Sequence, residues 1–237
     1  MNEVSAKSAI IFIETSTLVC SVAISEDRCI RAERVIKEPK AHAKIIPQLL
    51  REVITESGIG LEECRAICVS SGPGSYTGLR VGVSFAKGLC YGSGKPLISV
   101  GSLELLANCA TDMEGFTPGK YKYIVPMIDA RRMEVYTAIF SSDGKSITTV
   151  EAHIISEDSF SKELEEGAVL FCGDGAEKAA NIITHPNAHF IPLDSKASGM
   201  LRPALKKIEN NDFENVAYFE PFYLKDFIAG ISTKKMF

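Results

Sequence analysis

Short apolar runs separated by polar turns dominate the first part of the chain. Three of them predict the strands of a β-meander, at residues 8–13, 18–24 and 28–35. Residues 41–57 instead carry apolar side chains at every third or fourth position, which predicts an amphipathic helix that Gly58 and Gly60 end. The chain is therefore expected to begin as a small sheet covered by a helix.

Residues 66–89 combine a buried strand, a glycine-rich turn and a helix. Glycine allows positive φ and proline fixes φ near −65°, so Gly72-Pro73-Gly74 is a strong turn signal. Such a turn at a helix start exposes backbone N–H groups that can bind an anion, and Ser75 or Thr77 is expected to cap the helix. The spacing matches neither a P-loop nor a dinucleotide-binding loop.

Gly78, Gly82 and Ala86 recur every four residues in this helix and leave one face nearly bare. A glycine inside a helix costs about 1 kcal/mol relative to alanine, which indicates that another backbone comes close. The pattern leaves two interpretations open. The bare face packs on the chain's own sheet, or it binds another molecule.

The second half repeats the strand-rich character of the first. A polar segment at residues 111–120 predicts a boundary, so we expect an α/β protein of two lobes, residues 1–110 and 111–237. Pro126 predicts an edge or bulged strand position. Residues 168–183 predict a strand–turn–helix unit, and residues 198–208 predict a last helix. Residues 218–225 form an aromatic tail that is expected to dock on the body or return to the first lobe, and residues 226–237 are expected to be loose.

Composition narrows the classes of function. The chain is 46% apolar and 24% charged, as in a folded protein, and its net charge of −4 disfavours an autonomous nucleic-acid binder. Contact with RNA inside a complex stays open. The seven cysteines are odd in number and include no C-x-x-C pair, so neither disulfides nor zinc are indicated. With no apolar run of about 20 residues and no signal-peptide core, a cytoplasmic protein without membrane contact is expected.

Four stretches together carry a family resemblance: residues 72–89, 42–47, 129–136 and 221–225. They resemble the glycine signature, the His-Ser-x-x-Leu-Leu-Pro segment, the Asp-Ala-Arg-Arg-x-Glu-Val-Tyr segment and the Pro-x-Tyr-Leu-Arg tail of the TsaB (YeaZ) family. Two positions depart from that pattern: Glu14 stands where aspartate is usual, and Ala43 where serine is usual.

The resemblance implies an actin/hexokinase/Hsp70-like (ASKHA) fold of two RNase H-like lobes. It implies a non-catalytic scaffold or activator that binds TsaD, with TsaE, for threonylcarbamoylation of tRNA adenosine 37 (t6A). Partners would be TsaD and TsaE homologues, a second copy when TsaD is absent, and tRNA only through the complex. The alternatives are a weak ATPase or metal-independent hydrolase acting alone, and a direct tRNA-binding module with a basic stripe at Arg131, Arg132, Lys206 and Lys207.

The candidate chemistry is sparse. TsaD resembles this family in fold and carries Val-Asn-His-x-x-x-His, whose two histidines bind a metal. Here Ser102 and Leu106 stand at those positions, so neither a metal nor a catalytic residue is predicted. No cofactor is firmly implied, and ATP or ADP at the interface of the complex stays an open alternative.

In the second lobe, Asp129-Ala130-Arg131-Arg132 replaces the glycine-rich phosphate turn of the fold. An ion pair within a hairpin and a pair of guanidinium donors for a phosphate or a partner's carboxylate are both open. The residues expected at a partner interface are Ile45, Leu49, Gly78, Leu79, Gly82, Val83 and Ala86. Those expected near an anion or nucleotide are Gly72, Gly74, Ser75, Thr77, Arg80, Asp129, Arg131, Arg132, Gly173 and Gly175.

Overall fold

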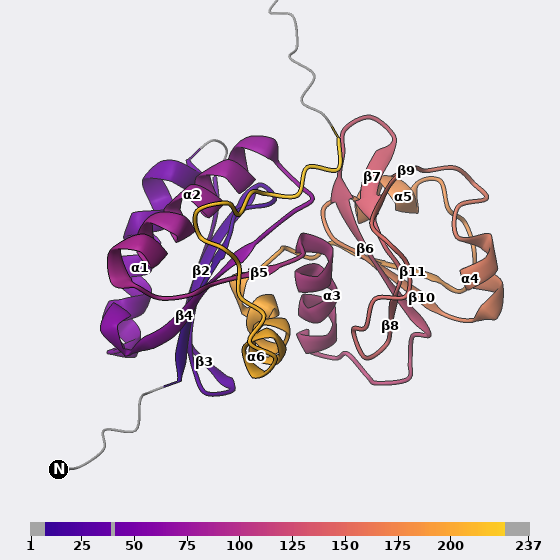
Figure 1. The fold of residues 1–237 in the computed structure, drawn as a ribbon. Helices are drawn as coiled ribbons and strands as arrows, with labels where there is room; N and C mark the ends of the chain where they lie inside the picture. Colours follow the sequence, from indigo (N-terminus) through magenta and orange to yellow (C-terminus); the bar gives the residue numbers. More distant parts are fainter. Residues whose placement is uncertain (1–7, 39–40, 226–237) are drawn as a thin grey trace, which may run out of the picture.

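Two β-sheets stand beside each other with a helix between them (Figure 1). The computed structural model describes residues 8–38 and 41–225. The predicted loose end at residues 226–237 lies outside these ranges. The predicted absence of a signal-peptide core concerns an N-terminal segment that lies partly outside them. Across the part of the chain that is described, no helix has both the length and the apolar character needed to cross a membrane.

The first sheet is built as the hydrophobic pattern predicts. Antiparallel strands form the meander, and two parallel strands extend it in the order β3-β2-β1-β4-β5. The strands are β1 (Ala9–Glu14), β2 (Val19–Glu26), β3 (Cys29–Lys37), β4 (Cys64–Ser70) and β5 (Leu97–Val100). Almost every residue of β1 and β2 is buried, because helices cover both faces of the sheet.

Two long helices pack against each other on one face, α1 (His42–Ser57) and α2 (Tyr76–Ser93), with a short 3-10 turn η1 (Leu61–Glu63) between them in sequence. The predicted helix of residues 41–57 is confirmed, including its end at Gly58 in a left-handed conformation. The other face carries α3 (Ser102–Asp112), a 3-10 turn η2 (Ala197–Met200) and α6 (Leu201–Glu209).

The second sheet is ordered β11-β10-β6-β7-β9, with β8 pairing the start of β6. Its strands are β6 (Tyr123–Asp129), β7 (Glu134–Thr137), β8 (Phe140–Ser141), β9 (Glu151–Ile154), β10 (Val169–Cys172) and β11 (Ala188–Ile191). Two short helices accompany it, α4 (Ser161–Glu166) and α5 (Ala176–Ala180).

Of the two positions predicted for Pro126, an edge or a bulge, the edge is wrong, because Pro126 lies in the central strand β6. The partner of β6 on one side changes from β8, which ends its pairing at Ile124, to β7, which begins at Met127. The Pro126 carbonyl faces that side and accepts a hydrogen bond from Thr137 Oγ1 at 2.9 Å. The missing N–H of proline therefore falls in a gap of the ladder, where no donor is needed.

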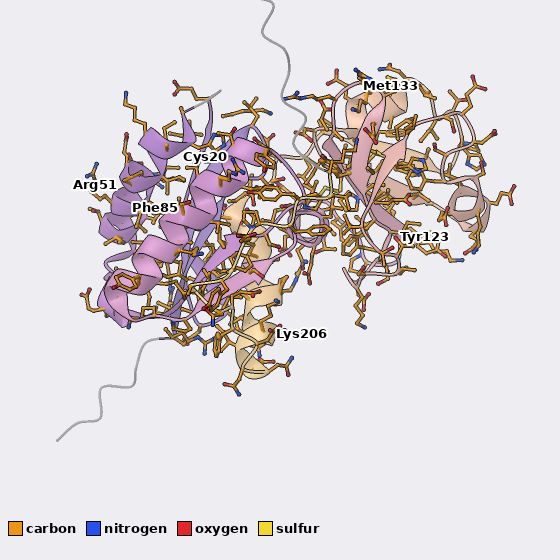
Figure 2. All side chains as sticks on the ribbon, turned by 45° about the horizontal axis from the view of Figure 1, so that its top comes forward. Cys20, Arg51, Phe85, Tyr123, Met133 and Lys206 are labelled. Atoms are coloured by element: carbon orange, nitrogen blue, oxygen red, sulfur yellow. The ribbon has the colours of Figure 1, made fainter. Side chains whose placement is uncertain are left out.

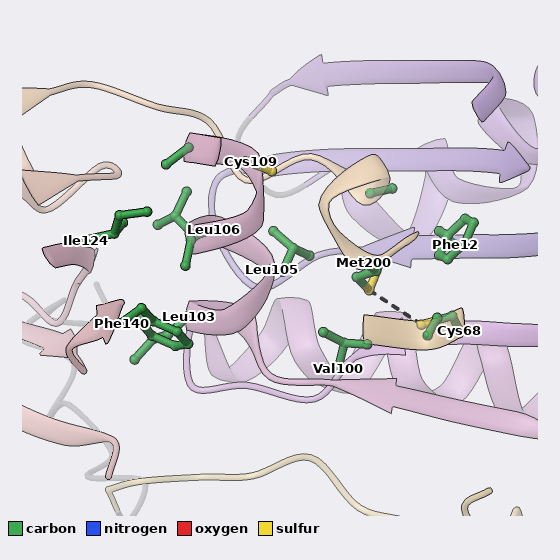
Figure 3. Packing of buried hydrophobic residues seen from close by; sticks show 14 of the residues in the cluster. Phe12, Cys68, Val100, Leu103, Leu105, Leu106, Cys109, Ile124, Phe140 and Met200 are labelled. Carbon is green, nitrogen blue, oxygen red and sulfur yellow. Dashed lines mark hydrogen bonds between the residues drawn. The ribbon is translucent and has the colours of Figure 1, made fainter. Parts of the chain in front are cut away.

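Helix α3 joins the cores of the two sheets. Leu105 points toward Met200, whereas Leu103 and Leu106 point toward Ile124 and Phe140 of the second sheet (Figure 3). All these side chains are buried in one continuous cluster. The predicted lobe boundary after residue 110 falls in the last turn of α3 and stays a prediction.

After α6 the chain runs along the edge of the first sheet and then across to the second (Figure 1). Glu214 N–H donates to the Leu97 carbonyl at 2.9 Å, and Phe222 N–H donates to Ser71 at 2.7 Å. The described chain ends at Lys225, whose ammonium pairs with Glu134 of β7. We call residues 213–225 the strap, because they connect one sheet to the other.

Candidate functional site

The glycine-rich turn after β4 is held on three sides by its own chain. Gly72 has a φ of 110°, and it exchanges two hydrogen bonds with Ser102, N–H to Oγ at 3.1 Å and carbonyl to N–H at 2.9 Å. A side chain at Gly72 would overlap the carbonyl of Phe222 in the strap, and one at Gly74 would overlap Ser16. Glycine is therefore required at this turn by close backbone approach.

The N–H donors of this turn are largely used within the chain. Ser71 donates to the Val100 carbonyl at 2.8 Å and Ser75 to the Ser16 carbonyl at 2.6 Å. The cap predicted at Ser75 is confirmed, because Ser75 Oγ accepts from Gly78 N–H at 3.2 Å. An anion at this turn stays a prediction, and it would have to compete with these internal acceptors.

The bare face of α2 packs on the chain's own sheet. A Cβ on Gly78 would overlap the Thr15 carbonyl, and a Cβ on Gly82 would overlap Thr15 Oγ1. Of the two interpretations that the spacing left open, the internal contact is therefore present at Gly78 and Gly82. Their direct contact with another molecule is not compatible with this packing, because Thr15 occupies the space.

The other residues predicted at an interface point into the same core. The side chains of Ile45, Leu49, Leu79, Val83 and Ala86 are all buried within the chain. Four of them, Ile45, Leu49, Val83 and Ala86, belong to the core that holds α1 and α2 on the sheet, and so they fix the position of the outer surface of the two helices. An interface on these helices stays a prediction. The residues available to a partner are those on the solvent-facing side of α1 and α2, next to the buried ones.

A shallow groove runs along that outer surface, with a volume of about 450 Å³. It is lined by Ala43, Ile46, Arg80, Val81, Ser84 and Phe85. We call this the α1–α2 groove; Figure 2 labels Phe85 on α2 and Arg51 on α1. Its lining is mostly apolar, which is typical of a surface that binds another protein. The spacing of Gly78 and Gly82 in the sequence predicted the helix α2, but it did not predict that the groove lies on the outer side of this helix.

Arg80 at one end of the groove is tied to the strap. Its Nε donates to Tyr223 Oη at 3.2 Å and its guanidinium lies 4.0 Å from the centre of the Tyr76 ring. Tyr76 and Tyr223 stack with ring centroids 4.2 Å apart. Arg80, predicted near an anion, is thus already in contact with two aromatic rings. Thr77, the alternative cap, is exposed.

A buried carboxyl group, that of Glu14, lies at the end of β1. From the sequence, Glu14 was recognised only as a departure from the family pattern. Glu14 is fully buried, and its Oε1 accepts from Ser16 N–H at 2.7 Å and from the Ser16 hydroxyl. Within the described residues its Oε2 has no hydrogen-bond partner. Burial raises the pKa of Glu14 to about 7, hydrogen bonds from Ser16 and Ser70 oppose this, and Asp174 adds a small increase.

Gly173 and Gly175 belong to a turn that packs on β6. Gly173 has a φ of 113°, and Gly175 N–H donates to the Met127 carbonyl at 3.0 Å. Between them, Asp174 accepts a hydrogen bond from Asp129 N–H at 2.9 Å, and burial raises the pKa of Asp174. This turn therefore supports the hairpin between β6 and β7, and adenosine contact here stays a prediction.

The hairpin between β6 and β7 corrects the expected ion pair. Asp129 pairs with Lys178 of α5 at 2.6 Å, and not with either arginine. Its carboxylate also accepts from Arg131 N–H at 2.7 Å. Arg131 and Arg132 both have positive φ, 68° and 49°, and both are exposed. The interpretation that the two guanidiniums are donors for another molecule stays open.

Ser102 and Leu106, where the resemblance predicts no metal ligand, are engaged within the chain. Ser102 is buried and receives the Gly72 N–H, and Leu106 is 1% exposed in the core around α3. Among residues 8–38 and 41–225, no group of three His, Cys, Asp or Glu side chains is arranged to hold a metal.

A family model described as TsaD, tRNA N6-adenosine threonylcarbamoyltransferase, matches residues 30–233. The chain is 28% identical over 230 residues to the Escherichia coli K12 tRNA threonylcarbamoyladenosine biosynthesis protein TsaB, which covers 93% of this chain and 96% of that protein. It is 36% identical over 127 residues to the protein of the same name from Haemophilus influenzae, covering 52% of this chain and 50% of that protein.

Among solved structures, YeaZ from Pseudomonas aeruginosa superposes with a TM-score of 0.79 at 23% identity, covering 92% of this chain and 100% of that one. This likeness, together with the two sheets and their topology, shows that the chain has the fold of that protein and confirms the predicted α/β class.

Proposed function

This chain belongs to the TsaD family, tRNA N6-adenosine threonylcarbamoyltransferase, as a member of its TsaB (YeaZ) group, and we propose that it is a non-catalytic scaffold that binds and activates TsaD. With TsaE, the pair would carry out threonylcarbamoylation of tRNA adenosine 37. The chain would act in the cytoplasm and would contact tRNA only within the complex, in keeping with its net charge of −4.

The observation that carries the proposal is the environment of Ser102 and Leu106 on α3. The resemblance implies that these two positions correspond to the metal-binding histidines of TsaD. Here the Ser102 hydroxyl accepts the Gly72 N–H, and Leu106 packs in the core shared by the two sheets. A leucine cannot ligate a metal, and a serine already engaged by a backbone donor is a poor ligand. The same place in the fold is used for stability.

The α1–α2 groove supports the scaffold role. It combines an apolar lining with the charged side chain of Arg80, a composition typical of protein interfaces. Gly78 and Gly82 of α2 pack on Thr15, and α1 and α2 share one buried core, so a partner would meet an already ordered surface. We propose that TsaD binds here, and that a second copy of this chain uses the groove when TsaD is absent.

The test is threonylcarbamoyl transfer to tRNA by purified TsaD, TsaE and the enzyme that makes threonylcarbamoyl-AMP, with and without this chain. Activity only when the chain is added, together with no activity of the chain alone, is the expected result. Equal transfer without the chain would contradict the proposal. ATP turnover or hydrolysis by the highly purified chain alone would favour the weak ATPase or metal-independent hydrolase instead.

A further inference from the structure

The hairpin of residues 129–134 presents two guanidiniums that have no partner within the described chain. Neither Arg131 nor Arg132 has a side-chain ion pair or hydrogen bond to any residue in the ranges 8–38 and 41–225. Both have positive φ, which non-glycine residues adopt only at a cost. Asparagine and glycine are the usual residues at such positions, so arginine at both requires another explanation.

The hairpin is held rigidly in this conformation. Lys178 Nζ binds Asp129 Oδ1 at 2.6 Å, the Arg132 carbonyl at 3.0 Å and the Glu134 carbonyl at 2.5 Å. Ala130 N–H donates to Glu134 at 3.0 Å and closes the turn. The ammonium group of Lys178 therefore fixes the backbone of the hairpin. Because this backbone is already ordered, less conformational entropy would be lost when a ligand binds to the two arginines.

The charge of the hairpin is left unbalanced by its neighbours. Asp129 is neutralised by Lys178, and Glu134 is neutralised by Lys225 of the strap. The two guanidiniums of Arg131 and Arg132 are the charged groups of the hairpin without an ion-pair partner among the described residues. The nearby carboxyl group of Asp174 is turned to the Asp129 N–H, with its pKa raised by burial. The two guanidiniums can each form two parallel hydrogen bonds to a carboxylate or phosphate, so an anionic group is the matching ligand.

Exposed apolar side chains lie beside the two arginines. Met133 in the same turn is 40% exposed and Ile154 at the end of β9 is 70% exposed. The sheet register places Ile154 opposite Glu134, and Met133 accepts a hydrogen bond from Ile155 N–H at 2.8 Å. Strand β9 is an edge strand of the second sheet. Arginine and methionine are both enriched at protein interfaces.

The two arginines and the two lysines of the expected basic stripe do not lie together. Figure 2 labels Met133, which follows Arg132, at the top of the part built on the second sheet, and Lys206 on α6 in the lower part of the view. Lys207 also pairs with Asp212 at 3.2 Å, so its charge is balanced within the chain. A short cationic tip flanked by apolar groups suits a protein better than a nucleic-acid backbone.

We propose that Arg131, Arg132, Met133 and Ile154 form a second docking surface, separate from the α1–α2 groove, for a protein that presents carboxylates beside apolar side chains. Phe85 in the groove and Met133 on the hairpin lie on different lobes (Figure 2), so one molecule could hold two partners at once. The identity of the partner rests on the proposed function: it would be a subunit of the tRNA-modifying complex.

The test measures binding of the full chain to purified TsaD and TsaE homologues of the same organism, and to tRNA. The variant combines Arg131→Asn with Arg132→Gly, residues that accept positive φ. We expect affinity for at least one subunit to fall tenfold or more while the melting temperature is kept or raised. Combining Arg131→Lys with Arg132→Lys keeps the charge, loses the forked geometry and should give an intermediate loss.

A control that combines Arg65→Gln with Lys162→Gln removes the same charge from two other exposed positions and should bind normally. Subunit affinities of the Asn and Gly variant within twofold of the wild type would overturn the proposal, as would a loss confined to tRNA. Failure of the wild-type chain to bind either subunit would instead contradict the proposed function, and the docking surface with it.

Discussion

Gly82 of α2 faces Thr15 at the end of β1 so closely that a methyl group on Gly82 would overlap Thr15 Oγ1. Thr15 is fully buried and its β-branched side chain has little freedom to move. The contact lies inside one chain and joins the glycine signature to the first strand. Substitution of Gly82 should therefore affect folding before it affects any partner.

We predict that Gly82→Ala lowers the free energy of unfolding by about 1–3 kcal/mol, the usual range for overpacking. Gly88→Ala in the same helix is the matched control, because its Cβ would meet no atom within 4 Å. It should raise stability by about 0.5–1 kcal/mol, as alanine is the better helix former. Urea unfolding measures both. Combining Gly82→Ala with Thr15→Ala should recover part of the loss.

Ser84 lies on the outer side of α2 and lines the α1–α2 groove. Ser84→Arg should leave the melting temperature within about 2 °C, since the side chain is exposed. It should weaken binding of TsaD, or self-association when TsaD is absent, at least tenfold, which is about 1.4 kcal/mol. Analytical ultracentrifugation or calorimetry gives the affinity. The control is Thr149→Arg, which also introduces an arginine in place of a small hydroxyl residue, at an exposed loop position between β8 and β9. Equal losses in both variants would remove the groove from the interface.

Tyr223 fastens the strap to α2 through its stack on Tyr76 and the hydrogen bond from Arg80. Tyr223→Ala should lower stability by about 1–2 kcal/mol, from the lost ring contact and hydrogen bond. Amide exchange of Phe222, whose N–H is bonded to Ser71, should become at least tenfold faster. Tyr218→Ala in the same strap is the control, because that side chain is 83% exposed. A strap equally protected in both variants would show that the stack does not hold it.

The parts of the fold predicted from sequence are those set by local patterns. The period of residues 41–57 identified α1, and Ser75 and Gly58 marked helix ends because capping depends only on neighbouring residues. The prediction of a helix at residues 198–208 was less accurate, because its first residues lie in the 3-10 turn η2 and α6 begins at Leu201. Likewise α5 ends at Ala180, before the expected 183.

The candidate site needed contacts between distant residues. The spacing of Gly78 and Gly82 shows which face of α2 is bare but not that Thr15 covers it. The partner of Asp129 is Lys178, which the topology brings beside the hairpin, whereas sequence reasoning considered only the adjacent arginines. Glu14 also gave little signal, because its full burial at the end of β1 comes from tertiary packing. Such pairings follow from the fold and not from any local pattern.

Glu14 predicts how the stability of this chain depends on pH. Burial raises its pKa from 4.5 to about 7 in the folded state, so the folded chain holds a proton that the unfolded chain releases. The resulting stabilisation is fully present below about pH 4.5 and is lost as the pH rises through 7. At 1.36 kcal/mol per pKa unit it amounts to something on the order of 3 kcal/mol.

Glu14→Gln replaces the carboxyl group with a neutral amide of similar shape, so it should remove this dependence. The variant should match the wild type near pH 5 and be the more stable of the two near pH 8, as measured by urea unfolding at both values. Asp174→Asn is the companion variant, since the pKa of Asp174 is also raised by burial and its charge acts on Glu14. If wild type and Glu14→Gln lose stability in parallel from pH 5 to 8, Glu14 is already ionised in the fold, and the unpartnered Oε2 must be stabilised by a group other than its own proton.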